Sequence, residues 1–290
     1  MPRFLLYFFL GITCLVLGGV LGFTMYERYF EGRVYPGVWL GESQEFTLRG
    51  KSQEEIIALV ENFEQQLGRD QIVFSVSDGP AGKHEIKVGP MLASTDPALA
   101  RELISFQPQA TAELALKIGR EGDFLTRFKT QLRLIIYGEV VTASFILDAE
   151  EIEKILLVNF SDWQKPATLP SLEKNALGDY MIKTGLSGIK LEIQNAVQAL
   201  INNMSALKNI PINISLTPVL PEVSVHEAAI LLPEAVDILE MAPFKIRAYG
   251  LEGAFKEWLL ERDRVMAWLS FAKEEGNVRL GLNSAKARET

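Results

Sequence analysis

Residues 4–26, FLLYFFLGITCLVLGGVLGFTMY, decide how this chain is organised, because 23 consecutive residues carry no charged side chain. At about 1.5 Å per residue, a helix of this length spans roughly 34 Å, which is enough to cross the hydrocarbon core of a bilayer. Arg3 precedes the run and favours a cytoplasmic N-terminus. We therefore expect an uncleaved, single-pass plasma-membrane anchor over residues 1–30, with the bulk of the chain extracytoplasmic.

The anchor is expected to present its large apolar side chains to the lipid bilayer. These residues are Phe4, Leu5, Leu6, Phe8, Phe9, Leu10, Leu15, Val16, Leu17, Val20, Leu21 and Phe23. The alternative is a cleaved signal peptide, whose apolar region is typically about 7–15 residues and ends at a small-x-small cleavage site. The run here is longer, and residues 22–26 contain no such site.

The composition indicates an ordered protein with room for two domains. The chain has 290 residues, and its 48% hydrophobic content is too high for a disordered chain. A net charge of -8 argues against a nucleic-acid binder, which would carry a basic surface. One cysteine, Cys14, lies inside the apolar run, and the chain has only two histidines. We therefore expect no disulfide framework, no metal site and no cofactor.

Beyond the anchor, helical and strand patterns alternate, which predicts an α+β fold. Ser52-Gln53-Glu54-Glu55 is a capping box, and it begins a helix with apolar residues at a 3-4-3 spacing. Further helices are expected from Asp96-Pro97, over 110–118, from Asp123, from Asp148 to 158 and over 192–207. Strands are expected at 72–77, 85–88, 140–147, 181–183 and 210–216, with turns at 78–80 and 185–188.

The pattern restarts after Pro218–Pro221, where we place a domain boundary. Ser224 opens a second capping box and one helix through Ala235, followed by a strand at 244–248, a helix at 261–271 and a strand at 278–282. The junctions at Leu147-Asp148 and Leu282-Asn283 look like copies of one strand-to-helix start. We infer an internal duplication, with a first module at 33–220 and a second copy at 221–290. The second copy stops where its last helix should begin, so we expect this chain to be part of a longer protein.

No motif for catalysis is found. His84 falls in an expected strand and His226 in a capping box, and neither lies beside a nucleophile elbow. Adjacent carboxylates such as Glu54-Glu55 and Glu150-Glu151 are better explained by the dipole at a helix start than by glycosidase chemistry. We therefore expect a protein that is not an enzyme.

Four side chains are candidates for ligand binding. Trp39 and Trp163, in an extended segment and a loop, could stack on sugars, whereas Trp268 has the spacing of a core residue. Arg120 and Arg127 could meet anionic groups. The alternative for both arginines is ordinary exposure to solvent.

Several short segments together resemble a known family. They are Tyr35-Pro36-Gly37-Val38-Trp39-Leu40-Gly41, the helix start at Ser52, residues 115–122 with the sequence ALKIGREG, Gly185-Leu186-Ser187-Gly188, and the Ser224-x-x-Glu227 start. The chain over residues 33–290 resembles the peptidoglycan-binding domain of VanW-type proteins, which also precedes the catalytic domain of some L,D-transpeptidases. Glu192 stands where the family usually has an aspartate cap, and no transpeptidase cysteine and histidine match.

The resemblance implies a membrane-anchored, tandem α+β module on the outer face of the membrane that binds peptidoglycan. It would position a C-terminal domain that this chain lacks, and no binding residues are known to transfer. The alternative function is a structural spacer that binds an envelope protein partner and no glycan. A third alternative, a glycan-processing enzyme that uses carboxylates, has the least support.

Overall fold

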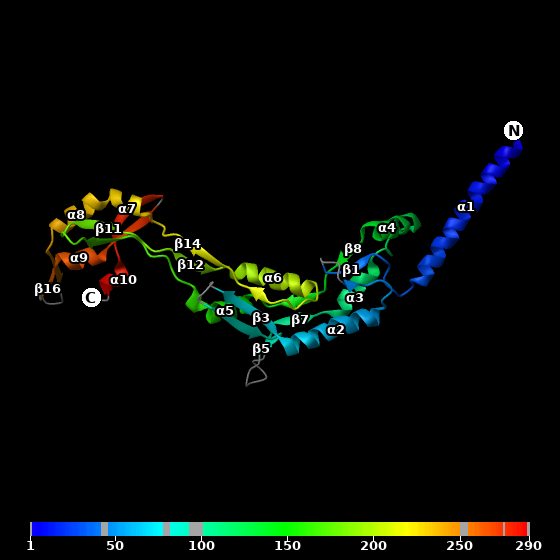
Figure 1. Cartoon of the computed structure of the whole chain (residues 1–290), viewed down its shortest axis with the longest axis horizontal. Coiled ribbons are helices and arrows are strands. Elements are labelled where there is room, and N and C mark those ends of the chain that lie inside the picture. Colours follow the sequence, from blue (N-terminus) through cyan, green and yellow to red (C-terminus); the bar gives the residue numbers. More distant parts are fainter. Residues whose placement is uncertain are drawn as a thin grey trace. The chain divides into compact units, whose positions relative to one another are not determined.

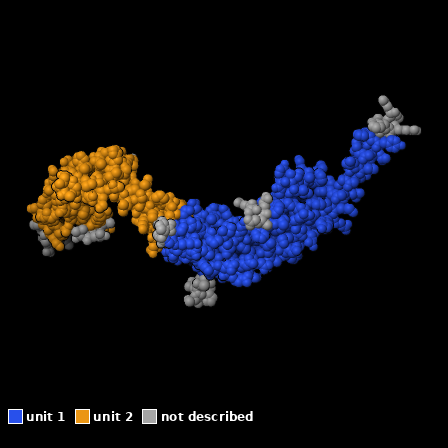
Figure 2. All heavy atoms as spheres, viewed as in Figure 1, with its two compact units in different colours: residues 1–159, 193–215 blue, residues 160–192, 216–290 orange. Residues whose placement is uncertain are grey.

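The computed structural model describes residues 2–41, 46–77, 82–92, 101–249, 255–274 and 276–288. Helices and short strands alternate along the chain, which confirms the α+β prediction (Figure 1). The chain divides into two compact units, residues 1–159 with 193–215, and residues 160–192 with 216–290 (Figure 2). The units do not follow the expected partition at 220/221, because residues 160–192 belong with the C-terminal unit.

The first unit begins with one long apolar helix. This helix, α1 (Pro2–Tyr29), contains a 23-residue segment, Tyr7–Tyr29, that is long and apolar enough to cross a membrane. A signal sequence near an N-terminus meets the same criteria. Eight of the expected lipid-facing side chains, from Phe8 to Leu21, are exposed, whereas Phe23 is buried. The side chains of Phe4, Leu5 and Leu6 lie outside the described residues.

In the part of the first unit that the structure describes, five further helices and four small sheets follow α1. The helices are α2 (Gln53–Asp70), α3 (Pro108–Lys117), α4 (Phe124–Tyr137), α5 (Ala149–Asn159) and α6 (Ile193–Ser205). The sheets are β2-β1-β8 (Phe46–Thr47, Val38–Leu40, Glu139–Val141), β13-β3-β4 (Ile212–Asn213, Ile72–Ser77, Lys83–Val88), β5-β6 (Met91–Leu92, Arg101–Glu102) and β7-β9 (Ile104–Phe106, Phe145–Leu147). β1 pairs with β8, and β3 with β13, in parallel, while the other pairs are antiparallel.

The predicted helix starts in this unit are confirmed. Ser52 and Glu55 form the capping box of α2, Asp123 caps α4, and Asp148 Oδ1 accepts from the Glu151 N–H at 3.1 Å. The expected turn at 78–80 and the helix start at Asp96-Pro97 lie outside the described residues.

The prediction of a single strand at 140–147 is wrong, because this segment contains two strands, β8 and β9, which belong to different sheets. Between them the Ala143 N–H donates to the Ser205 carbonyl and the Ser144 N–H to Thr111 Oγ1, each at 2.9 Å, so the backbone leaves the ladder. The expected strand at 210–216 is divided in the same way, between β13 and β14 (Leu216–Val219).

The second unit consists of antiparallel strand pairs and short helices. Its pairs are β10-β11 (Ser171–Lys174, Tyr180–Lys183), β12-β14 (Gly188–Leu191, Leu216–Val219), β15-β16 (Phe244–Tyr249, Phe255–Leu260) and β17-β18 (Leu269–Glu274, Asn277–Leu282). Its helices are α7 (Val225–Ile230), α8 (Leu232–Glu240), α9 (Arg262–Trp268) and α10 (Ser284–Arg288), with a 3₁₀ turn at Ser161–Trp163. β12 and β14, which precede and follow α6 and β13 in the sequence, pair with each other.

Two expected helices of this unit differ from the structure. The helix expected from Ser224 to Ala235 is divided at Leu231, because Pro233 in the first turn of α8 cannot donate a backbone hydrogen bond to continue α7. The helix expected at 261–271 ends at Trp268. Leu269 and Phe271 are instead buried residues of β17. They are two residues apart, which is the repeat of side chains on one face of a strand.

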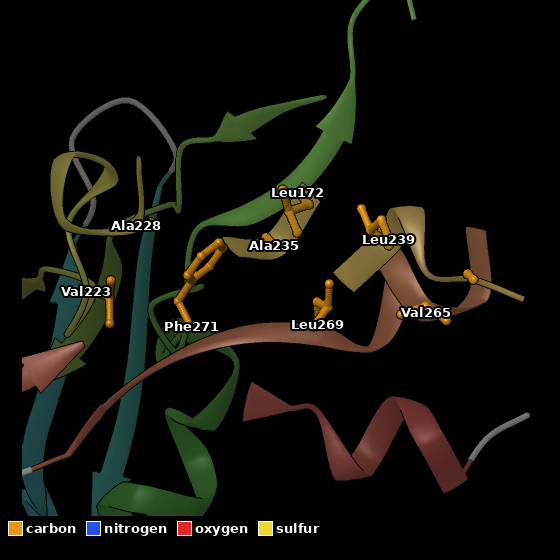
Figure 3. Packing of buried hydrophobic residues seen from close by; sticks show 9 residues of the cluster. Leu172, Val223, Ala228, Ala235, Leu239, Val265, Leu269 and Phe271 are labelled. Atoms are coloured by element: carbon orange, nitrogen blue, oxygen red, sulfur yellow. The ribbon is translucent and has the colours of Figure 1, made fainter. Parts of the chain in front are cut away.

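The core of the second unit is a small apolar cluster. Phe271 and Leu269 of β17 lie among Ala235 and Leu239 of α8, Val265 of α9 and Leu172 of β10 (Figure 3).

The start of α10 repeats the cap seen at the start of α5. Asn283 Oδ1 accepts from the Lys286 N–H at 3.1 Å, which is the same cap geometry as at Asp148. The duplication inferred from these two junctions stays a prediction.

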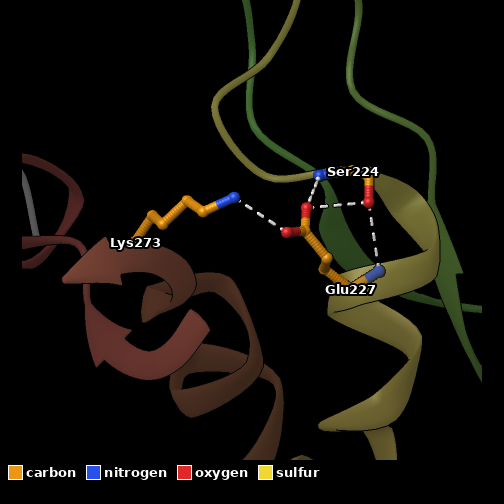
Figure 4. A network of polar contacts seen from close by, with 3 residues as sticks. All are labelled: Ser224, Glu227 and Lys273. Atoms are coloured by element: carbon orange, nitrogen blue, oxygen red, sulfur yellow. Dashed lines mark hydrogen bonds and ion pairs between the residues drawn. The ribbon is translucent and has the colours of Figure 1, made fainter. Parts of the chain in front are cut away.

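The second capping box is confirmed and is extended by an ion pair. The Ser224 N–H donates to Glu227 Oε2 at 2.8 Å, and Lys273 Nζ of β17 donates to Glu227 Oε1 at 2.8 Å (Figure 4). The Lys273 contact, followed by the Ser224 hydrogen bonds, lowers the pKa of Glu227 from 4.5 to about 2. The network therefore joins the start of α7 to β17 through one carboxylate.

This pKa predicts a defined pH dependence of stability. A carboxyl group whose folded pKa is depressed stabilises the fold fully above pH 4.5 and loses that contribution as the pH falls through 2. Glu227→Gln keeps an acceptor for Ser224 but removes the charge. In thermal unfolding from pH 6 to about pH 2, we expect the wild-type midpoint to fall more steeply below pH 4.5 than the variant midpoint. Lys273→Gln should flatten the same window, and parallel curves for all three proteins would contradict the assignment.

Candidate functional site

The end of α1 is packed into the first unit. The ring of Phe23 makes edge contacts with Phe124 and Phe128 of α4, with centroids 4.9 and 5.3 Å apart. Tyr26 stacks on Tyr35, which follows α1 in the sequence, at 5.7 Å. Because these rings are apolar on their packed faces, the last two turns of α1 are held by burial.

Arg120, in the turn between α3 and α4, joins the end of α3 to the segment that follows α1. Its guanidinium donates to the carbonyls of Leu116, Phe30 and Arg33, with a distance of 2.7 Å to Phe30. It also lies over the Tyr35 ring, 4.6 Å from the centroid. Leu116 lies in the last turn of α3, where carbonyls lack a partner within the helix, and Arg120 supplies one. Burial raises the pKa of Tyr35, which Arg120 partly offsets, so this phenol stays neutral.

Gly119 makes the close approach of Arg120 to the junction sterically feasible. Its φ is +76°, and a Cβ there would lie 3.1 Å from Tyr35 Cδ2 and 3.2 Å from Leu134 Cδ1. The Gly119 carbonyl accepts from Gln131 Nε2 at 3.0 Å. Gly119 is therefore a packing site directly after α3.

Arg127 belongs to the same junction. Its Nε lies 3.3 Å from Glu27 Oε1 without hydrogen-bond geometry, and both side chains are half-buried. Gln131 Nε2 lies 3.4 Å from the same Glu27 oxygen. The structure thus gives Arg120 and Arg127 a structural role, and ligand binding by either residue stays a prediction.

Sequence reasoning did not identify Glu27, Tyr35 or Gln131 as partners in this junction. One feature of the sequence could have identified Glu27 as a candidate: it is a carboxylate directly after an apolar run. Arg127, Gln131 and Leu134 follow at helical spacing, which predicts a shared face but gives no partner for it.

The two tryptophan candidates lie in different compact units. Trp39 is in β1, half-buried, and its indole edge lies against Gly138, where a Cβ would be 3.2 Å from Trp39 Nε1. Trp163 is half-buried in the 3₁₀ turn of the second unit. The structure does not place either tryptophan beside the two arginines, whose partners are Glu27, Phe30, Arg33 and Tyr35.

A groove of about 460 Å³ along α2 has both polar and apolar residues in its lining. Its apolar part comes from Phe46 of β2, Phe63 of α2 and Leu207 after α6, and its amides are Asn62 and Gln66. Lys51 and Glu55 line one end. The capping box at Ser52 fixes the start of α2 and places Asn62 and Gln66 one turn apart on its exposed side. This combination of aromatic faces and planar amides suits a hydroxyl-rich ligand.

The second unit has a cavity of a different kind. It measures about 360 Å³ and is lined only by apolar residues and one glycine: Ile238, Phe244, Ile246, Leu260, Val265, Trp268, Leu269, Leu280, Gly281 and Leu282. Its lining offers no side-chain donor or acceptor except the Trp268 indole, so it suits an apolar partner side chain better than a sugar. Trp268 therefore lines a cavity and is not part of the fully buried core.

Among the described residues, no cluster of three or more His, Cys, Asp or Glu side chains could hold a metal ion. Comparison of the chain with protein families, with curated proteins and with solved structures finds no match. The resemblance to the VanW-associated domain therefore stays a prediction that rests on the short motifs quoted above.

The contacts of Arg120 predict that lysine cannot replace it. An ammonium group cannot donate to three carbonyls in this geometry and also stack on Tyr35. We expect Arg120→Lys to lower the free energy of unfolding of the full chain in detergent micelles by about 1–3 kcal/mol, measured by urea denaturation. The control is Arg133→Lys, at an exposed arginine that pairs with Glu139 at 2.9 Å and should change stability by less than about 0.5 kcal/mol. Equal effects of both changes would contradict the role of Arg120.

Proposed function

We propose that this chain is a membrane-anchored, non-catalytic module of the cell envelope that binds peptidoglycan. α1 is the anchor in this proposal, and the groove along α2 is the glycan site. The observation that carries the proposal is the lining of this groove, where two phenylalanines lie beside two amides and a lysine.

The aromatic, amide and basic side chains of the groove each have a counterpart in the chemistry of a peptidoglycan strand, whereas Glu55 accepts from the Ser52 N–H in the capping box. The faces of Phe46 and Phe63 suit the C–H faces of pyranose rings, which bind aromatic surfaces through apolar contact. Asn62 and Gln66 each offer a donor and an acceptor to hydroxyl and acetamido groups. Lys51 offers a cation to the carboxylates of lactyl ethers and peptide stems. The overall charge of -8 means that such contacts, and not general electrostatic attraction, must supply affinity.

Gln66→Ala tests this site, and Gln65→Ala is its matched control on the same exposed helix. Gln66 lines the groove and Gln65 does not contribute to its lining. Loss of one hydrogen-bonding side chain should weaken binding about two- to tenfold. The measurement is co-sedimentation of detergent-solubilised full-length protein with sacculi freed of teichoic acid, at physiological salt. We expect saturable binding that Gln66→Ala weakens and Gln65→Ala leaves unchanged. Equal effects of the two variants would rule out the groove, and no saturable binding of the wild type would rule out peptidoglycan binding.

The apolar cavity of the second unit favours a second candidate function, an envelope spacer that binds a protein partner. A cavity of about 360 Å³ with an apolar lining suits an inserted aliphatic or aromatic side chain. On this alternative the full chain would show no saturable binding to sacculi, and Leu280→Asp at the cavity would abolish capture of an envelope protein that the wild type retains.

A further inference from the structure

The apolar side chains of α4 form a stripe that is exposed and does not face the core of the first unit. Five large apolar side chains follow one another at spacings of three, four, three and one residues: Leu125, Phe128, Leu132, Ile135 and Ile136. All five are between 47% and 70% exposed. The buried residues of α4 are Gln131 and Leu134. An amphipathic helix of a globular unit normally buries its apolar stripe, so this arrangement calls for a second apolar environment.

The stripe is continuous with the surface of α1. Phe128 contacts Phe23, and a crevice of about 170 Å³ between the two helices is lined by Phe23, Tyr26, Phe128, Gln131, Leu132 and Ile135. Figure 1 shows α4 next to the C-terminal end of α1. A bilayer that surrounds α1 at the position of Phe23 would therefore also contact α4.

The position of Phe23 along α1 sets the depth of this contact. Phe23 precedes Tyr29, the last residue of the candidate span, by six residues, which is about 9 Å along a helix. Amphipathic helices that lie in a membrane interface bury their apolar face about 5–10 Å into the boundary between headgroups and acyl chains. The level at which α4 meets α1 agrees with this depth.

Basic side chains lie where headgroup phosphates would be. Lys129 and Arg133 follow one edge of the stripe, one turn apart on α4. At the end of α1, Arg33 and Arg49 line a recess of about 500 Å³ together with Tyr29. Long basic side chains at such positions place their methylenes along the apolar phase and their charges among the headgroups.

We propose that α4 lies in the outer-leaflet interface as a second membrane-contacting element, with Leu125, Phe128, Leu132, Ile135 and Ile136 among the acyl chains. The preferred surface contains anionic phospholipid, which complements Lys129, Arg33 and Arg49. This inference rests on the anchoring of α1 in the proposed function and does not depend on peptidoglycan binding. Two separated contacts, α1 and α4, would fix the orientation of the first unit on the membrane.

The test is depth-dependent fluorescence quenching in the full-length protein. Cys14 is the only cysteine, so Cys14→Ala allows single fluorophores at Ile136→Cys on the stripe and Thr126→Cys on the polar side of α4. A third probe at Leu17→Cys reports α1 itself. The proteins are reconstituted in nanodiscs of equal parts phosphatidylcholine and phosphatidylglycerol, with nitroxide-labelled lipids as quenchers. We expect shallow nitroxides to quench the Ile136 probe at least about twofold more than the Thr126 probe.

The outcomes separate this inference from the anchoring on which it rests. Quenching at Leu17 without excess quenching at Ile136 would overturn the interfacial position of α4 and leave the anchor in place. No quenching at Leu17 would overturn both. A blue-shifted but unquenched Ile136 probe would show that protein, such as a second copy of this chain, covers the stripe, and would also overturn the proposal. Leu125→Cys repeats the test at the opposite end of the stripe in case the first variant does not fold.

Discussion

The contact between the Arg120 guanidinium and the carbonyls of Phe30 and Arg33 is the constraint on which the account of the first unit depends. Phe30 and Arg33 follow α1 directly, and the Phe30 carbonyl also accepts from the Arg33 N–H at 2.9 Å. Arg120, which is 90 residues from Phe30 in sequence, adds a hydrogen bond to each of these two carbonyls. Gly119 allows this close approach and the guanidinium lies over the Tyr35 ring, so one side chain links the end of α3 to the segment that follows α1.

A rigid junction has consequences for the rest of the unit. It holds α4 against Phe23, in the last two turns of α1. The groove along α2 belongs to the same compact unit as this junction. The second unit has its own hydrophobic core and a cavity whose lining is apolar. The polar groove and the apolar cavity therefore belong to different compact units.

Local hydrogen bonds made much of this fold predictable from sequence. The caps at Ser52, Asp148 and Ser224 join residues three apart, and all three begin helices as expected. The failures have non-local causes: the strand expected at 140–147 is broken by contacts with Thr111 and Ser205, which no local pattern contains. The site was less predictable for the same reason. Arg120 looked like an exposed cation because Phe30 and Tyr35 are distant in sequence, and the α2 groove exists only because Phe46 and Leu207 meet that helix.

Hydrogen exchange at the junction, measured on the full-length protein in a bilayer, tests the rigid connection most directly. The Phe30 N–H donates to the Tyr26 carbonyl at 3.2 Å and the Val34 N–H to the Lys51 carbonyl at 3.0 Å, on either side of the end of α1. A rigid junction predicts that both amides exchange at least about 100-fold more slowly than in an unstructured chain. Exchange of both amides at the unstructured rate, while the amides of α2 stay protected, would mean that a flexible linker joins the anchor to the unit and would contradict the account.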